Sequence, residues 1–208
     1  MQLLCAAILL SPQATSPAAE AKAIFAQSEA KLKAAKSLEG ANVATTGKWT
    51  ETFLLAKPGS FRVENPRVKM ICNGVTQWSL MLASKEYFKR DVRKTGGFGP
   101  PASLDGFYGK PTGSSAPYYV KSTTFEMRKS GGKRLAAKTL IFDSYDRKDS
   151  MTFLVDAATK LPVGWDQNFG GQRMSFRFKR LVLGAKVPAG AFTWKPPSGW
   201  KEKVPGRS

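Results

Sequence analysis

The chain has 208 residues, 42% of them hydrophobic and 11% aromatic, which suits one domain with an apolar core and excludes a disordered protein. Thirty-three lysines and arginines against fifteen acidic residues give a net charge of +18, which favours anionic partners. Histidine is absent from the sequence and only two cysteines occur, so the commonest general base is missing and a disulfide framework is excluded.

The N-terminal segment resembles the later part of a secretory signal peptide. Its first nineteen residues carry no charge, and an apolar run at residues 3–10 is followed by small and helix-breaking residues. The run is too short to span a bilayer. Residues 1–20 are therefore predicted to be a signal-peptide-like segment of an exported protein, with a disordered tail as the alternative. Stretches 16–18 and 19–21 both fit a cleavage pattern, so the cleavage site stays open.

Residues 21–38 predict one long helix, because they are rich in alanine and lysine. Glu29 and Lys33 are spaced to form a favourable ion pair along its surface. Gly40 is expected to end the helix as its C-terminal cap. One narrow face carries Ile24, Phe25, Ser28, Leu32 and Ala35.

From residue 42 onward the hydrophobic period changes to two, and turn signals recur between short strand-like runs. This pattern predicts a mainly β domain built on an antiparallel sheet of about ten strands, wide enough to twist and curl. A curled sheet has a concave apolar face that other segments must cover. The helix and the Gly-, Pro- and Ser-rich loop at residues 94–117, with a short helical turn near 102–108, are the available covers.

The sequence KPGS at residues 57–60 predicts a type II turn, with proline and glycine at its two central positions. Phe61 and Val63 are then expected to face the concave side of the sheet. Arg62 is expected on the other side, paired with Glu64 or in solvent.

Two further strands show clear patterns. Asn-Gly at residues 73–74 predicts a hairpin, and the returning strand is expected to carry Trp78, Leu80 and Leu82 on one face. Residues 172–182 alternate between an apolar and a basic face, which predicts a strand whose cations, Arg177 among them, point away from the core. The apolar positions of that strand are Met174, Phe176 and Phe178.

No motif indicates catalysis or a cofactor. Gly131-Gly132-Lys133 lacks the phosphate-loop spacing, and the aspartates at 143, 146 and 149 do not match a calcium loop. The chain is therefore interpreted as a non-enzyme without a metal or cofactor. Nucleic acid is not an expected partner, because alternation puts aromatic and cationic side chains of strand 172–182 on opposite faces.

The order of several segments resembles a known family. KPGSFRVE (57–64) is followed by NGVTQWS (73–79), then an aromatic pair at 87–88, VDAATKLPVGW (155–165) and AFTWKPPSGW (191–200). Across residues 21–200 this arrangement resembles the periplasmic outer-membrane lipoprotein carrier and sorting proteins, the LolA/LolB-like superfamily.

The resemblance implies a half-open β barrel whose concave face is closed by a lid, in a single domain at 21–200, and a carrier of a lipid or lipoprotein acyl chain. Residues 201–208 are expected to be a flexible basic tail. The signal-like start predicts a periplasmic or otherwise exported protein, expected to be a monomer, and its outward-facing cations are expected to dock it on anionic membrane. Lys57 stands where the carriers have an arginine that holds the lid closed, and Arg62 is assigned to the lid or rim. The alternative is a filled core in a basic module that binds an anionic polymer or a partner protein. The predicted ligand-facing residues are Phe53, Leu55, Phe61, Val63, Trp78, Leu80, Phe125, Met127, Phe153, Trp165, Met174, Phe176 and Phe178.

Overall fold

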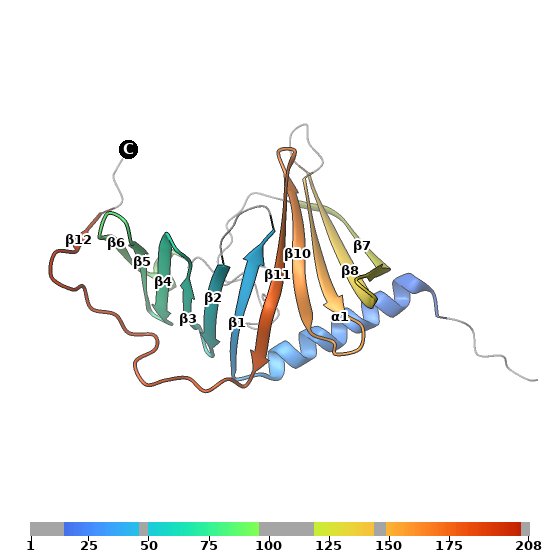
Figure 1. Ribbon diagram of the computed structural model, residues 1–208, viewed down its shortest axis with the longest axis horizontal. Coiled ribbons are helices and arrows are strands. Elements are labelled where there is room, and N and C mark those ends of the chain that lie inside the picture. The colour runs from blue at the N-terminus through green and yellow to red at the C-terminus, as the bar shows by residue number, and fades with distance from the viewer. Residues whose placement is uncertain (1–14, 46–49, 96–118, 144–148, 205–208) are drawn as a thin grey trace, which may run out of the picture.

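The computed structural model describes residues 15–45, 50–95, 119–143 and 149–204 (Figure 1). Within these residues the chain forms a long helix, α1 (Pro17–Ala34), a short helix, α2 (Val92–Thr95), and a 12-stranded sheet. The strands are β1 (Ser37–Ala44), β2 (Thr50–Ala56), β3 (Ser60–Glu64), β4 (Val68–Asn73), β5 (Thr76–Met81), β6 (Glu86–Asp91), β7 (Tyr119–Ser130), β8 (Lys133–Asp143), β9 (Ser150–Asp156), β10 (Pro162–Phe169), β11 (Gln172–Leu183) and β12 (Lys201–Glu202).

The sheet is open, with β12 and β7 at its two edges and the order β12-β6-β5-β4-β3-β2-β1-β11-β10-β9-β8-β7. Consecutive strands pair in two antiparallel runs, β1 to β6 and β7 to β11, and the pairing of β11 with β1 joins them. The short β12 pairs with β6 in the parallel direction. The predicted fold class, a mainly β, curved antiparallel sheet with an N-terminal helix, is confirmed (Figure 1).

The helix begins and ends earlier than the predicted range of 21–38. Ser16 caps its first turn by accepting a hydrogen bond from a backbone N–H at 3.2 Å, and proline occupies the first helical position. The predicted cap, Gly40, lies inside β1, a strand that the prediction missed. A Cβ at Gly40 would lie 2.3 Å from the ring of Phe53, so the glycine is explained by close packing between strands.

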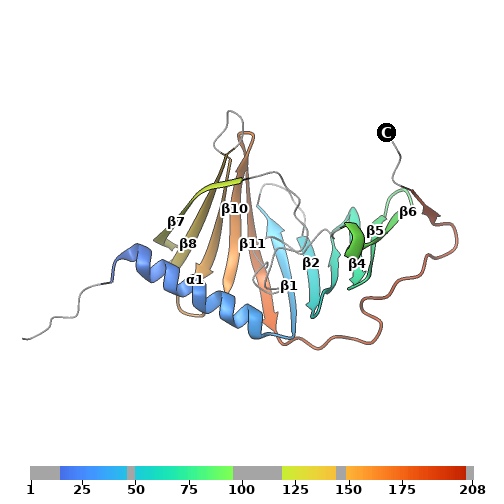
Figure 2. The same cartoon turned by 180° about the vertical axis from the view of Figure 1, so that it is seen from behind.

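Helix α1 covers the concave face of the sheet at β7–β9 (Figures 1 and 2). Ile24 and Phe25 pack against Ala136 of β8 and Val155 of β9 in one buried cluster. Further along the helix, Lys138 lies 3.8 Å from Glu29. These contacts fix the helix across several strands, so it serves as the cover that the apolar pattern required.

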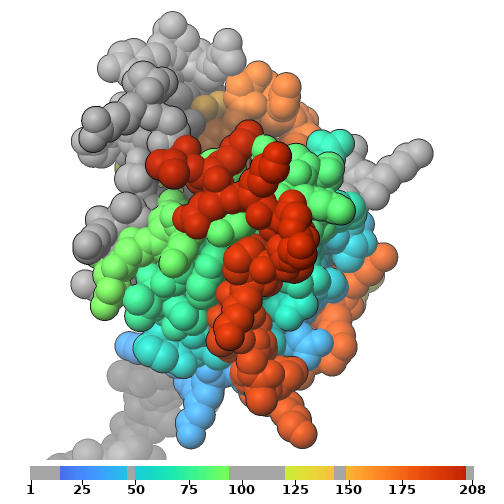
Figure 3. Space-filling view, turned by 90° about the vertical axis from the view of Figure 1, so that its left-hand side faces the viewer, coloured from blue at the N-terminus to red at the C-terminus, as the bar shows by residue number. Residues whose placement is uncertain are grey.

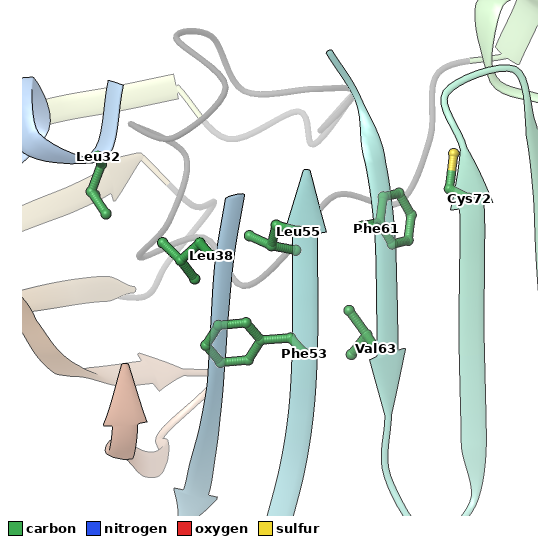
Figure 4. Packing of buried hydrophobic residues seen from close by; sticks show 7 residues of the cluster. All are labelled: Leu32, Leu38, Phe53, Leu55, Phe61, Val63 and Cys72. Atoms are coloured by element: carbon green, nitrogen blue, oxygen red, sulfur yellow. The ribbon is translucent and has the colours of Figure 1, made fainter. Parts of the chain in front are cut away.

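A second cluster on the same face begins where α1 ends (Figure 4). Leu32 of the helix meets side chains of the first four strands, all of them buried. Burying a side chain of this size stabilises the fold by roughly 1.5–3 kcal/mol. The strand residues of this cluster are Leu38, Phe53, Leu55, Phe61, Val63 and Cys72.

The opposite face of the sheet has a different cover, residues 184–204, called here the C-terminal strap. Figure 3 shows the strap, orange to red, lying across the green and turquoise strands of the first half of the chain. Trp194 and Trp200 pack against a buried cluster of Ile71, Leu80 and Tyr87. The strap ends in β12, so residues 201–203, expected to begin a flexible tail, are tied to β6 by backbone hydrogen bonds.

The turn between β2 and β3 differs from its predicted type. A type II turn needs a positive φ at its second central residue. Gly59 is not among the residues with positive φ, and the Lys57–Pro58 peptide bond is cis. The type II assignment is therefore wrong, although the hairpin itself is confirmed by pairing of Ala56 with Ser60. Most of the loop at 94–117, including the helical turn expected near 102–108, lies outside the described residues.

Candidate functional site

Four of the predicted ligand-facing residues lie together in the packed core of the concave face. The register pairs Phe53 with Val63 and Leu55 with Phe61, so all four side chains share one face of β2 and β3. Each is at most 5% exposed, and Figure 4 shows them beside Leu38 of β1. These side chains hold the sheet together, and they form the floor of one end of the concave face.

Three more predicted residues lie beneath α1. Phe125 and Met127 of β7 and Phe153 of β9 pack against the buried cluster that the helix makes. The rings of Phe25 and Phe125 meet edge to face with centroids 5.8 Å apart. The helix therefore occupies the surface that these residues offer.

Between these two packed regions runs a line of touching aromatic rings, called here the central aromatic row: Trp165, Phe176, Phe178 and Phe53. Trp165 stacks on Phe176 with centroids 4.4 Å apart, and its centroid is 5.9 Å from that of Phe178. Phe178 meets Phe53 edge to face at 5.8 Å. Trp165 and Phe53 are buried, whereas Phe176 and Phe178 are only half-buried, as is the neighbouring Met174. The row thus carries accessible aromatic surface at the middle of the concave face.

A polar pair borders this row and was missed at the level of sequence. Asn42 of β1 lies opposite Phe178 and is 2% exposed. Its amide nitrogen donates a hydrogen bond of 3.2 Å to Glu51 of β2. Burial raises the pKa of the Glu51 carboxyl, despite hydrogen bonds from Asn42 and Asn65 that oppose the rise. An acid on an alternating strand gives no sign of this in sequence, because its burial depends on the neighbouring strand.

The end of the concave face at β4–β6 is also polar. Gln77 is fully buried, and its side-chain oxygen accepts a hydrogen bond of 2.9 Å from Arg90. Burial of Arg90 lowers its pKa. Cys72 lies on the same face and is buried, and burial raises the pKa of its thiol. Polar side chains therefore interrupt the apolar surface of the concave face at β5 and β6.

Trp78 and Leu80, two of the predicted ligand-facing residues, lie on the other side of the sheet. Ile71 pairs with Arg62 on one side and with Trp78 on the other, which places these three on the face opposite Phe61. Both predicted residues belong to the cluster beneath the strap, with Trp78 half-buried. Grouping them with the concave residues is wrong, because the turn at 65–67 resets which residues of β4 and β5 face inward.

Lys57 contacts the covering helix. Its ammonium group donates a hydrogen bond to the backbone carbonyl of Lys33 in the last turn of α1, and its backbone N–H donates to Lys36 at 3.0 Å. A cation at this end of a helix meets unpaired carbonyl groups and the negative end of the helix dipole. Lys57 therefore ties the β2–β3 turn to the end of α1.

Arg62 and Arg177 both point away from the concave face. Arg62 forms an ion pair with Glu64, as expected, and lies on the face opposite the concave side, not at the rim or lid to which it was assigned. Arg177 pairs with Asp166 at 2.7 Å and also donates to the carbonyl oxygens of Trp165 and Phe176. Arg177 is thus a structural side chain that joins β10 to β11.

A pocket of about 510 Å³ lies on this opposite face, beneath the first part of the strap. It is called here the strap pocket. Its floor is formed by outward-facing residues of β1, β2 and β3, and its roof by strap residues 188–191. The charged residues that line it are Glu39, Arg62, Glu64, Arg180 and Lys186.

Within the part of the chain that the structure describes, no cluster of three potential metal ligands occurs. In the same residues, no helix combines the length and apolarity needed to cross a bilayer.

No family model and no curated protein matches the chain. Among solved structures, an uncharacterized conserved protein from Thermus thermophilus is similar with a TM-score of 0.54 at 10% identity, over 88% of this chain and 99% of that one. At this identity the likeness shows a shared fold alone.

Two weaker structural matches have informative names. MucB matches with a TM-score of 0.44 and 16% identity over 83% of this chain, which spans 63% of the MucB chain. A LolA superfamily protein from Nitrosomonas europaea matches with a TM-score of 0.33 and 9% identity, over 84% of this chain and 97% of that one. The second of these structures bears the name of the superfamily that the sequence resembles.

Proposed function

We propose that the protein is a non-catalytic binding protein or carrier of the cell envelope that holds an apolar or amphiphilic ligand on its concave face. The ligand class is a lipoprotein acyl chain or another lipid. The observation that carries this proposal is the central aromatic row, because Phe176 and Phe178 keep accessible surface between two packed regions. A core that served packing alone would bury its central aromatics most completely.

The chemistry of the concave face suits a ligand with a long apolar part. Ring faces bind hydrocarbon through buried area, at about 25 cal/mol per Å², and need no directional contact. Asn42 and Glu51 border the row and supply a small number of polar groups. Ligand sites commonly combine an apolar lining with a few such groups. A polar head beside this pair and a chain along the row would use both features.

The direct test is native mass spectrometry of protein purified from a lipid-containing host, followed by titration with a fluorescent fatty acid. We expect a co-purifying lipid mass and saturable uptake of the fatty acid. If the protein carries no lipid and takes up no fatty acid, the concave face is a filled core and the proposal fails.

A matched pair of variants locates the ligand. Phe176→Ala removes a ring from the central aromatic row, and we expect fatty-acid affinity to fall about tenfold, which corresponds to about 1.4 kcal/mol of lost contact. Trp78→Ala removes a half-buried ring from the opposite face and should leave affinity within about twofold. Circular dichroism checks that both variants fold. Equal losses in the two variants would place the ligand elsewhere.

The charge of +18 supports docking on an anionic membrane, where each lysine or arginine near the surface contributes about 1 kcal/mol. Exposed Arg173 and Lys179 of β11 are candidates for this contact. The same charge also favours the rival function, a basic module that binds an anionic polymer or partner protein. Salt separates the two, because screening weakens exposed charge contacts and spares apolar burial. Lipid retained at about 1 M salt would support the carrier, and loss of all association would support the rival.

A further inference from the structure

The two halves of the C-terminal strap meet the sheet differently. The second half packs directly onto it, with Trp194 and Tyr87 ring centroids 5.0 Å apart. The first half leaves the strap pocket of about 510 Å³ between itself and the sheet. Its roof carries only small side chains there, Pro188 to Ala191, so the strap does not fill the space beneath it.

The roof is an ordered turn rather than a loose segment. The N–H of Ala191 donates to the carbonyl of Pro188 at 3.2 Å, and Thr193 donates from both its N–H and its hydroxyl to the carbonyl of Gly190. Gly190 has φ of +74°, a conformation that favours glycine. The pocket therefore has an ordered turn on one side and paired strands on the other.

The floor is apolar or small at its centre and charged at its sides. Register places Leu54 beside Arg62 and Ala41 beside Arg180, with Thr52 between Ala41 and Glu64. Arg62 and Arg180 thus stand on β3 and β11, on either side of β1 and β2. A ligand on the floor would have a guanidinium group on each side.

Positive charge exceeds negative charge around this floor. Arg180 lies 3.3 Å from Glu39, and Glu64 is held by Arg62 and also by Lys69 at 2.8 Å. Lys186 completes the lining from the strap. Within the described residues no carboxylate lies within ion-pair distance of Lys186. The walls therefore offer at least one cation that no acid neutralises, and Arg180, whose side chain is 62% exposed, can leave Glu39 at little cost.

We propose that the strap pocket binds a small organic anion, with a carboxylate or phosphate group between Arg180 and Lys186 and an apolar body on Leu54 and Ala41. The volume falls in the range of about 300–1,000 Å³ that small-molecule sites occupy. Guanidinium groups suit carboxylate and phosphate because they donate two parallel hydrogen bonds. This site is on the opposite face from the proposed lipid and is independent of it.

The test is a titration of the full chain with phenyl phosphate as the probe, monitored by the NMR chemical shifts of the backbone amides. We expect saturable shifts at the amides of Ala41, Thr52, Leu54 and Gly190. Benzyl alcohol, which has the ring without the charge, should give no saturable shift at those amides. Inorganic phosphate should bind at least tenfold more weakly than phenyl phosphate, because it lacks the apolar body.

Two pairs of variants separate pocket binding from general attraction to a basic protein. Ala41→Leu fills the floor and should weaken phenyl phosphate at least tenfold, whereas Val43→Leu, one step along the same face of β1 and outside the pocket lining, should not. Arg180→Gln should lower the affinity for phenyl phosphate by a similar factor, whereas Arg128→Gln, which breaks another exposed ion pair, should not.

Shifts that fail to saturate, or equal affinities within either pair of variants, would mean surface attraction only and would overturn the site. The lipid proposal is tested apart from this one, since Phe176→Ala should leave phenyl phosphate binding unchanged.

Discussion

The two faces of the sheet are covered by segments of different kinds. On the concave face, side chains from one side of α1 pack against β7–β9. Those that contact Ala136 and Val155 are buried. On the opposite face, the strap has no repeating structure until β12 and is anchored mainly by Trp194 and Trp200. A helix can fill a surface evenly, whereas an extended segment touches it at anchor points and leaves space between them. That difference explains why a pocket lies under the strap.

The first prediction tests the helical cover and should show the largest effect. Phe25→Ala removes a ring that is 7% exposed and packs on Phe125. We expect a loss of about 3–5 kcal/mol in the free energy of unfolding, because a buried cavity remains beneath the helix. In a domain of this size, that corresponds to a fall in Tm of roughly 10 °C.

Lys22→Ala is the matched control, because Lys22 is exposed on the same helix. Its effect should stay within about 0.5 kcal/mol. A loss below about 1 kcal/mol for Phe25→Ala, measured by urea unfolding, would show that α1 is not packed as described.

The second prediction tests the strap and should show a smaller, local effect. Trp194→Ala removes contacts with the rings of Tyr87 and Trp200, at centroid distances of 5.0 and 5.6 Å. Because Trp194 is only half-buried, we expect the free energy of unfolding to fall by about 2 kcal/mol. This is less than the loss of about 3–5 kcal/mol typical of a fully buried ring. Hydrogen exchange should quicken at the amides of Lys201 and Lys203, which donate to β6 and its preceding turn.

Exposed Lys195→Ala is the control for the strap, and it should leave those amides protected. Faster exchange throughout β1–β5 in Trp194→Ala would contradict the view that the strap opens on its own.

The alternation of side chains within a strand could be predicted from the sequence. The face of the sheet on which a strand places its apolar residues could not be predicted across turns. The faces of Phe61, Val63 and Arg62 within β3 were predicted correctly, because period two within one strand is a local property. Trp78 and Leu80 were assigned to the wrong face, because the turn between β3 and β4 decides which parity points inward. Face assignment therefore fails wherever a turn, rather than a strand, sets the register.

Features that depend on two distant segments could not be predicted at all. The strap pocket requires residues 188–191 to meet strands that lie more than a hundred residues earlier in the chain. Gly40 was taken for a helix cap because glycine suits that role, whereas the ring of Phe53 is what excludes a side chain there. Asn42 and Glu51 belong to the same class, since each looks like a surface residue of an ordinary strand.

The smallest predicted effect compares one glutamate on each face. Glu51, on the concave face, is desolvated and has amide partners, so its pKa is raised. For Glu64, on the opposite face, burial alone would raise the pKa, but Lys69 and Arg62 outweigh burial and lower it. The two carboxyls should therefore contribute to stability with opposite dependence on pH.

A raised pKa means that the folded state binds the Glu51 proton more tightly than the unfolded state. Its contribution is therefore full below the unfolded pKa and is lost as pH rises through the folded pKa. The contribution of Glu64 is present above its unfolded pKa and is lost as pH falls through the lower folded value. Glu51→Gln should thus make the protein more stable at about pH 7, with the gain vanishing near about pH 4. Glu64→Gln should cost about 0.5 kcal/mol at about pH 7, a value kept small by partial exposure. Urea unfolding of both variants at these two pH values measures the difference, and changes of the same sign at neutral pH would show that the two faces do not differ in the environment they give a carboxylate.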